Sequence, residues 1–201
     1  MGVGKKHKNR IGIDIDAVVA DTNTSIIDVV NKQFGLSLTI NDMDIASFVE
    51  NYEGIPSEHR VSFAKSLFNN NHFYENLTMV EGADKVINAL AAEGYRIFYI
   101  TTRPRSSSKT TLKWLTHNDL YPPDTRILHP RDYEDDLEFK QKKVDMLELD
   151  IFLEDRLEVV NKIYIPVILF DYPYNRGITS ANVTRVHSWV EAERVIRNLY
   201  R

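Results

Sequence analysis

Five short apolar segments of the sequence are bounded by polar or turn-forming residues and show no regular alternation of apolar and polar positions. Short runs of this kind, rich in isoleucine, valine and phenylalanine, are typical of strands that are buried on both faces of a sheet. The sequence therefore predicts strands at residues 11–15, 96–101, 126–128, 150–153 and 166–170.

Segments with the apolar spacing of a helix lie between these strands. Apolar positions recur at helical spacing over residues 83–93, around 112–115 and around 144–149, and Gly94 is a favoured residue just after a helix end. Strands that alternate with helices through short connections form a parallel sheet covered by helices. The expected fold class is α/β, a Rossmann-like parallel sheet with helices on both faces.

The stretch from residue 22 to residue 80 breaks this rhythm, because it contains no strand-like run. Its apolar spacing predicts helices over residues 26–34, around 42–50 and over roughly 57–69. We expect a small helical cap domain inserted after the first strand. The predicted division is a core domain of residues 1–21 and 81–201 and a cap domain of residues 22–80.

The composition is that of a globular protein, with 201 residues, 43% hydrophobic and 27% charged. A net charge of −4 argues against a protein dedicated to nucleic acid polymers, which normally has a basic face. The absence of cysteine excludes disulfides, thiolate nucleophiles and zinc–thiolate sites. The first ten residues are predicted to be a solvated tail, and no apolar run is long enough for a membrane span. We expect a cytoplasmic monomer or homodimer without membrane contact.

Carboxylates follow two of the predicted strands at the edge where such sheets bind ligands. They are Asp14 and Asp16 at the end of the first strand and Glu154 and Asp155 at the end of the fourth. Asp14 and Asp16 point to the same side, because residues two apart in an extended chain share a face. Four carboxylates at one edge repel one another unless a cation neutralises them, and hard oxygen ligands favour Mg²⁺.

A magnesium site with a threonine hydroxyl and a lysine nearby can bind phosphate, because both the ion and the lysine offset its negative charge. Thr101 ends the second strand, and Lys140, Lys142 and Lys143 precede the fourth. One carboxylate could then attack phosphorus, as in enzymes that form an aspartyl-phosphate. The carboxylate two residues on could protonate the leaving oxygen and later deprotonate water.

Three segments carry a family resemblance. Residues 11–22 resemble motif I of the haloacid dehalogenase (HAD) superfamily, residues 98–104 resemble motif II, and residues 150–156 resemble motif IV. Their order and separations are similar to those of the superfamily from residue 11 to about residue 176. The Thr-x-Arg-Pro and Glu-Asp-Arg sequences, with Pro173-Tyr-Asn-Arg176, most resemble the cytosolic 5′(3′)-deoxyribonucleotidase (type C) group and its uncharacterised bacterial relatives.

The resemblance implies a role for each matching residue. Asp14 corresponds to the nucleophile and metal ligand, and Asp16 to the general acid/base whose main-chain carbonyl also binds the metal. Thr101 corresponds to the phosphate-binding hydroxyl and Asp155 to a direct metal ligand, and Glu154 would bind the metal through water. Many relatives have glycine where this chain has Ala17, which we expect to affect substrate fit rather than reaction type.

Motif III, a lysine before the fourth strand, is the weakest match. Lys140 is preferred because it precedes the helix whose buried stripe contains Val144 and Leu147, and Lys143, which shares that face, is the alternative. Arg103 and Arg156 are expected to form salt bridges within the carboxylate cluster. In the insertion, Phe48, Tyr52, His59 and Arg60 are predicted to face the strand ends.

The leading hypothesis is a Mg²⁺-dependent phosphomonoester hydrolase that acts through an aspartyl-phosphate on a small phosphorylated substrate. A (deoxy)nucleoside 5′-monophosphate is the first candidate, from the resemblance alone. A phosphoryl transferase or mutase would use the same residues and is an alternative. A non-catalytic nucleotide-binding regulatory module is another, although it predicts loss of a catalytic residue and none is lost.

Overall fold

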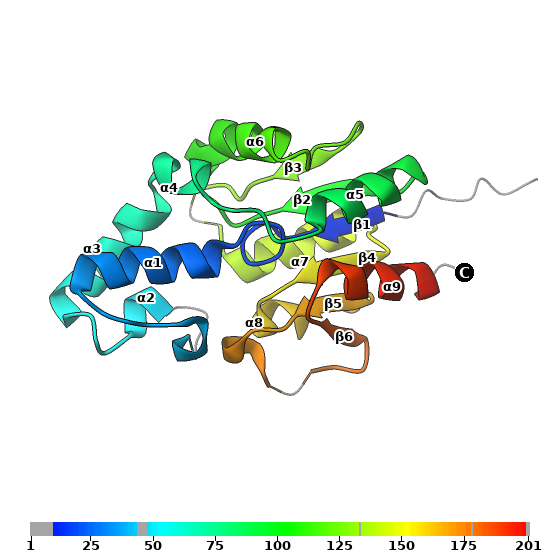
Figure 1. Cartoon of the computed structure of the whole chain (residues 1–201). Coiled ribbons are helices and arrows are strands. Elements are labelled where there is room, and N and C mark those ends of the chain that lie inside the picture. The colour runs from blue at the N-terminus through cyan, green and yellow to red at the C-terminus, as the bar shows by residue number, and fades with distance from the viewer. Residues whose placement is uncertain (1–9, 44–47, 133, 178, 200–201) are drawn as a thin grey trace, which may run out of the picture.

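The computed structural model describes residues 10–43, 48–132, 134–177 and 179–199 (Figure 1). Residues 1–9 of the predicted tail lie outside the described residues. Arg10, expected to belong to that tail, instead begins the first strand, where its main-chain N–H donates to Asp150 Oδ2 at 2.6 Å. Its guanidinium also pairs with Glu148 at 2.9 Å.

Six parallel strands form one sheet in the order β3-β2-β1-β4-β5-β6. They are β1 (Arg10–Ile13), β2 (Arg96–Ile100), β3 (Arg126–Leu128), β4 (Ile151–Glu154), β5 (Val167–Phe170) and β6 (Val183–Val186). The α/β fold class is thus confirmed, and the five predicted strands are present. The sixth strand was not predicted, because Val183-Thr-Arg-Val186 is short and polar at two of its four positions.

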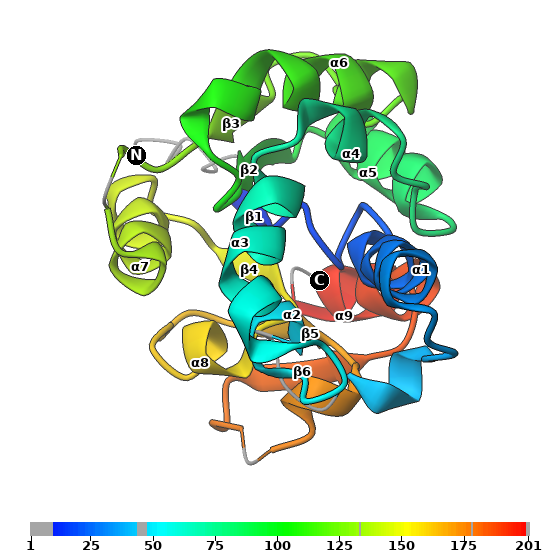
Figure 2. The ribbon, with the colours of Figure 1, turned by 90° about the vertical axis from the view of Figure 1, so that its left-hand side faces the viewer.

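Helices cover both faces of this sheet (Figure 2). One face carries α5 (Ala83–Ala92) and α9 (Trp189–Leu199), and the other carries α7 (Asp136–Met146) and α8 (Leu157–Val160). Alternate residues of β2 show the division: Ile97 and Tyr99 pack in the cluster with α5 and α9, whereas Phe98 and Ile100 pack with α7 and α8. Trp114 and Leu115 bring α6 (Ser108–His117) into the first cluster.

The described part of residues 22–75 lies beyond the carboxyl ends of the strands (Figure 1). Its described elements are α1 (Thr22–Phe34), a 3₁₀ turn (Ile40–Asp42), α2 (Phe48–Asn51), α3 (Ser57–Phe68) and α4 (Asn71–Glu75). The helix expected around 42–50 is therefore seen as two short pieces, and residues 44–47 lie outside the described residues. None of the described residues between 22 and 80 belongs to a strand; Met79 alone forms an isolated bridge, with Ala20.

The inserted helices pack on the sheet through shared apolar residues. Ile26 and Val30 of α1 are buried in the same cluster as Ile13 of β1 and Phe170 of β5. Helix α1 is capped at its N-terminus by Asp21, whose side chain accepts the N–H of Thr24 at 3.3 Å. The division of the chain into core and cap domains stays a prediction. No helix within the described ranges is long and apolar enough to cross a membrane.

Candidate active site

A cavity of about 660 Å³ opens at the carboxyl ends of β1 and β4. The chain leaves β1 toward β2 and β3 and returns to β4 on the other side of β1, so this is the point where the strand order reverses. Ligands of open α/β sheets bind at such a point. The cavity wall includes Asp14, Asp16 and Asp155 from the strand ends, Asn23, Phe68 and Tyr74 from the inserted segment, and Tyr174 after β5.

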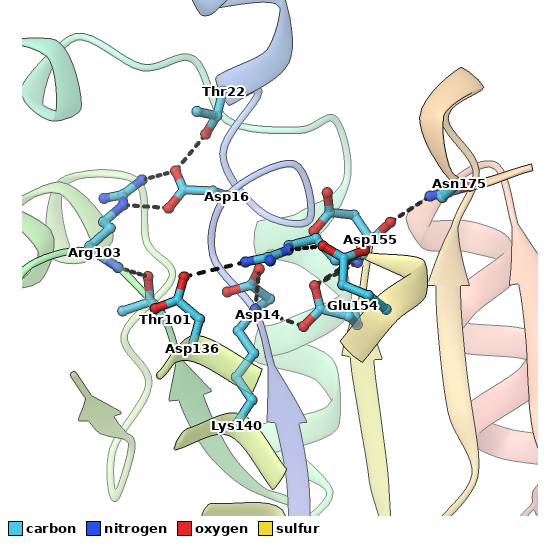
Figure 3. Close-up of polar contacts among 12 residues, drawn as sticks. Asp14, Asp16, Thr22, Thr101, Arg103, Asp136, Lys140, Glu154, Asp155 and Asn175 are labelled. Carbon is cyan, nitrogen blue, oxygen red and sulfur yellow. Dashed lines mark hydrogen bonds and ion pairs between the residues drawn. The ribbon is translucent and has the colours of Figure 1, made fainter. Parts of the chain in front are cut away.

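Three buried carboxylates meet at the floor of this cavity (Figure 3). Asp14, Glu154 and Asp155 each offer an oxygen, and these three oxygens lie within 4.8 Å of one another. Lys140 Nζ lies 2.9 Å from Asp14 Oδ2 and 2.7 Å from Glu154 Oε2. One ammonium group does not balance three carboxylates. Asp14 Oδ1 is buried without a hydrogen-bond partner among the described residues, so these oxygens fit a divalent cation.

Helix α7 decides which lysine reaches this group. Its first turn is fixed by Asp135, whose Oδ1 accepts the N–H groups of Leu137 and Glu138, each at 3.0 Å. Lys140 then points inward and is fully buried. Lys143, the alternative, is half-buried, and its ammonium group lies over the ring of Phe139 at 5.5 Å. The structure places Lys140, and not Lys143, against Asp14.

Glu154 has both carboxylate oxygens engaged. Its Oε2 accepts from Lys140, and its Oε1 accepts the main-chain N–H groups of Asp155 at 3.0 Å and Arg156 at 3.1 Å. Glu154 therefore fixes both the lysine and the chain that carries Asp155. Burial raises the pKa of Glu154, but the charge of Lys140, the hydrogen bonds to Glu154 and the charge of Arg156 together outweigh that effect, so the net pKa is below its ordinary value.

The other carboxyl groups of the cluster hold protons more tightly than usual. Burial raises the pKa of Asp14 to about 7, and the charges of Glu154 and Asp16 act in the same direction against the opposing charge of Lys140. Burial and the neighbouring Glu154 raise the pKa of Asp155 well above its ordinary value. Cation binding would favour the ionised forms of both groups.

Asp16 faces a different set of partners. Its carboxylate accepts hydrogen bonds from Arg103 Nε and Nη2, each at 2.8 Å, and from Thr22 Oγ1 at 2.6 Å (Figure 3). Burial raises the pKa of Asp16, but the charge and hydrogen bonds of Arg103, together with the Thr22 hydrogen bond and the charge of Lys140, outweigh that effect, and the net pKa lies below its ordinary value. The side chain of Asp16 is outside the group of three carboxylates. Only its main-chain carbonyl was expected to bind the metal.

Thr101 is fully buried at the end of β2. Its Oγ1 accepts the main-chain N–H of Arg103 at 3.2 Å, and its own N–H donates to Leu128 at 3.1 Å. The cavity wall at this strand end is formed by Thr102 and Pro104. Thr101 thus lies behind the wall, and its hydroxyl oxygen holds the turn that carries Arg103.

Comparison with known proteins agrees with this geometry. A family model described as 5′ nucleotidase, deoxy (pyrimidine), cytosolic type C protein matches residues 8–200. The chain belongs to this family. It is a phosphatase that resembles 5′-nucleotidases, and its fold is that of HAD-superfamily hydrolases, which confirms the relationship predicted from the three motifs.

Individual relatives of this type C family member span almost its whole length. A protein of Halalkalibacterium halodurans that bears the name "Putative nucleotidase BH1399" is 30% identical over 192 residues, covering 94% of this chain and 92% of its own. A predicted phosphatase from Clostridium acetobutylicum has the same fold, with a TM-score of 0.66, 18% identity and coverage of 95% and 99%. The structure of the HAD-hydrolase YfnB of Bacillus subtilis, solved with magnesium bound, matches with a TM-score of 0.60 and 13% identity. The match covers 95% of this chain and 99% of YfnB.

The inserted segment of this nucleotidase-like chain contributes different aromatic residues from those expected. His59 is exposed, Arg60 Nε donates to the carbonyl of Ile55 at 2.7 Å, and Tyr52 packs against the apolar core. These three residues are not among those that line the cavity, and the side chain of Phe48 lies outside the described residues. The insertion instead places Phe68 and Tyr74 in the cavity wall.

Sequence reasoning also missed two contacts of the site. Arg156 pairs with Asp136 at 3.5 Å and Glu158 at 2.8 Å at the cavity rim, rather than with the acidic cluster as expected. Tyr174 Oη donates to Asp155 Oδ2 at 2.5 Å. The sequence signal for this second contact was the Pro173-Tyr-Asn-Arg176 motif, to which no role had been given.

Proposed function

We propose that this protein hydrolyses the phosphate ester of a (deoxy)nucleoside 5′-monophosphate, with Mg²⁺ as cofactor and Asp14 as nucleophile. The proposal rests on one observation above all: Asp14 presents an unpartnered oxygen beside Lys140 and two further carboxylates on the cavity floor. The family description, the relative's name as a nucleotidase and the magnesium bound to the Bacillus subtilis structure support it.

The proposed magnesium ligands are Asp14, Asp155 and the main-chain carbonyl of Asp16, with Glu154 acting through water. When bound there, the ion offsets the negative charge of the phosphate oxygens. Lys140 contributes a second positive charge at Asp14, which lowers the repulsion between the nucleophile and a phosphate dianion. Thr101 was expected to bind phosphate through its hydroxyl; because its Oγ1 accepts the N–H of Arg103, we propose that it stabilises the turn that carries Arg103.

In the first step, an oxygen of Asp14 attacks phosphorus and the bond from phosphorus to the ester oxygen breaks. Asp16 gives a proton to that oxygen, and the nucleoside leaves as an alcohol. Because Arg103 holds Asp16 ionised in the free protein, the proposal requires that Asp16 take up this proton when the substrate binds. In the second step, Asp16 takes a proton from water while the water oxygen attacks phosphorus. The bond between Asp14 and phosphorus breaks, inorganic phosphate leaves, and both carboxyl groups return to their initial states.

The shape of the cavity supports a small substrate. A volume of about 660 Å³ lies within the usual range for sites that enclose small molecules. Phe68 offers a ring on which a base can stack, and Glu50 and Asn23 offer polar groups. We propose that residues 22–80 act as a cap domain that selects the substrate. A cytoplasmic location also stays a prediction.

The experiment is a phosphate-release screen over nucleoside monophosphates and sugar phosphates, with Mg²⁺ or with EDTA. We expect the highest kcat/KM for one or more nucleoside monophosphates, no release in EDTA and recovery after Mg²⁺ is restored. Full activity in excess EDTA would exclude the metal site. Transfer of phosphate to an added alcohol rather than to water would favour a phosphoryl transferase, and no turnover of any compound would favour a regulatory module.

Two amide variants test the division of roles between the aspartates. Asp14→Asn should abolish turnover, because the amide does not attack phosphorus. Asp16→Asn should still form some phosphoenzyme from p-nitrophenyl phosphate, whose leaving group hardly needs a proton. Equal residual activity of the two variants on that substrate would reject the assigned roles.

A further inference from the structure

A short turn after β5 contacts Asp155 at two points. The turn is a 3₁₀ helix over Pro173–Asn175. Its two contacting residues, Tyr174 and Asn175, follow Asp155 in the sequence by 19 and 20 residues. Tyr174 Oη donates to the carboxylate oxygen Oδ2 at 2.5 Å, and Asn175 Nδ2 donates to the main-chain carbonyl at 2.6 Å (Figure 3 shows the second contact). Asp155 is therefore held through both its side chain and its main chain.

Asn175 is itself rigidly fixed. It is fully buried, and its Nδ2 also donates to the carbonyl of Phe170, the last residue of β5, at 2.7 Å. Its Oδ1 accepts from Arg185 Nη1 at 2.6 Å and from the N–H of Tyr172 at 3.2 Å. Since both polar atoms of the amide are engaged, the contact with Asp155 is anchored to β5 and β6.

Tyr174 connects Asp155 to the inserted segment. Its hydroxyl donates to Asp155 and accepts from Asn23 Nδ2 of α1 at 2.9 Å. Its ring stacks on that of Tyr172, with centroids 5.4 Å apart and planes within 3° of parallel. These contacts fix the orientation of the ring and the direction of the hydroxyl.

We propose that Tyr174 and Asn175 are positioning residues that hold Asp155 in the orientation needed for cation binding. Tyr174 engages the carboxylate oxygen Oδ2, and Asp155 also offers an oxygen to the group that it forms with Asp14 and Glu154. Hydrogen-bond partners of this kind commonly contribute 10- to 100-fold to metal affinity, because they fix the ligand before the ion binds. This inference rests on the cation site of the proposed function and gives the Pro173–Arg176 motif a role.

The test is Tyr174→Phe, with Mg²⁺ affinity measured by isothermal titration calorimetry at fixed pH. Loss of the hydroxyl frees Asp155 to rotate, so we expect the Kd for Mg²⁺ to rise about 10- to 100-fold. Tyr172→Phe is the matched control, because its hydroxyl donates to the carbonyl of Ala17 at 2.9 Å and not to Asp155. That control should keep the Mg²⁺ affinity of the original protein. Asn23→Ala, which removes the second contact of the Tyr174 hydroxyl, should weaken binding in the same direction but less.

A second readout separates positioning from general damage. In Tyr174→Phe, the Mg²⁺ concentration for half-maximal hydrolysis should rise, while kcat at saturating Mg²⁺ recovers. A kcat that stays low at every Mg²⁺ concentration would overturn the inference, as would an unchanged Kd or an equal loss in Tyr172→Phe. If the unsubstituted protein binds Mg²⁺ and Tyr174→Phe binds it equally well, only this inference fails. If the unsubstituted protein binds no Mg²⁺, the proposed metal site fails with it.

Discussion

Arg103 donates two parallel hydrogen bonds to the carboxylate of Asp16, from Nε to Oδ2 and from Nη2 to Oδ1, each 2.8 Å long. The arginine is 2% exposed, and its guanidinium carbon lies 4.4 Å above the ring centroid of Tyr74 in α4. Such forked contacts are strong and fix the plane of the carboxylate. Arg103 therefore orients the proposed acid/base and joins it to the inserted segment.

Replacing Arg103 tests how much its paired hydrogen bonds to Asp16 contribute to hydrolysis. Arg103→Lys keeps the charge but loses one of the two parallel bonds, so Asp16 should no longer be held in one orientation. We expect kcat/KM for a nucleoside monophosphate to fall about 10- to 100-fold, which is part of the 10²–10⁴ that a general acid supplies. The fall for p-nitrophenyl phosphate should be smaller, because its leaving group barely needs a proton.

Arg105→Lys is the control for this comparison, because Arg105 is exposed in the same loop. It should leave kcat/KM for both substrates unchanged. An equal loss on both substrates in Arg103→Lys would show that Arg103 supports folding or phosphate binding rather than Asp16.

The raised pKa of Asp14 predicts that cation binding depends on pH. In the cation-free protein Asp14 has a pKa of about 7, so below that pH the ion must displace a proton. Mg²⁺ affinity should therefore fall about tenfold in total as the pH drops from 8 to 6, and about tenfold for each further pH unit below 6. Calorimetry in buffers of different ionisation enthalpy counts that proton. Affinity that does not change with pH would contradict the prediction.

The raised pKa of Asp14 also affects the free energy of unfolding of the cation-free protein. Because the folded pKa of Asp14 lies above its ordinary value of 3.8, the folded state binds more protons than the unfolded state between these two values. The free energy of unfolding that Asp14 contributes must then decrease as the pH rises through this window. Denaturant titrations in EDTA at several pH values should show this decrease, and it should be smaller in Asp14→Asn.

Ala17 has a left-handed backbone conformation, with φ of 59°, which glycine adopts at less cost. Ala17→Gly should raise the free energy of unfolding by about 0.5–1 kcal/mol, because relief of the left-handed strain exceeds the entropy cost of glycine. Denaturant unfolding measures the change. Ala20→Gly is the control: Ala20 is buried and its φ is not positive, so that substitution should destabilise the protein. A loss of stability in both variants would show that Ala17 is unstrained.

The sheet could be predicted because its signal is local. Each central strand contains a short apolar run, and the carboxylates of Asp14 and Glu154 follow such runs directly. The edge strand β6 was missed because its burial is partial and polar residues occupy half of it. Helix α9 carries its apolar side chains at helical spacing, Trp189, Ala192 and Ile196, so its pattern was available in the sequence.

The partners within the site depend on contacts distant in sequence. Lys140 and Lys143 lie three residues apart on one helix, and only the start of α7 at Asp135 decides which of them reaches Asp14. The hydrogen bond from Tyr174 to Asp155 depends on how the turn after β5 packs against the end of β4. The spacing of residues along the sequence does not show that packing. For the same reason the aromatic residues of the insertion could be recognised, but not the direction in which each one points.

Phe68 of α3 provides the sharpest test of substrate selection. Its ring belongs to the cavity wall, whereas Phe63, on the same helix, packs edge-on against Phe34 with centroids 5.1 Å apart. A base stacked on an aromatic ring contributes about 1–3 kcal/mol in single-stranded nucleic-acid binding, which corresponds to about 5- to 150-fold in affinity. Phe68→Ala should therefore lower kcat/KM for the best nucleoside monophosphate within that range. Hydrolysis of p-nitrophenyl phosphate, which has no base, should barely change.

Phe63→Ala is the matched control for this measurement, because it removes a ring of the same size from the same helix. It should lower the melting temperature, since a packed ring is lost, while the ratio of kcat/KM for the two substrates stays constant. The ratio is the decisive quantity, because loss of folded protein lowers both activities equally and cancels. If Phe68→Ala leaves the ratio unchanged, its ring is part of the packing of the insertion and substrate selection must rest on other residues of the cavity wall, of which Tyr74 and Glu50 are the next to replace.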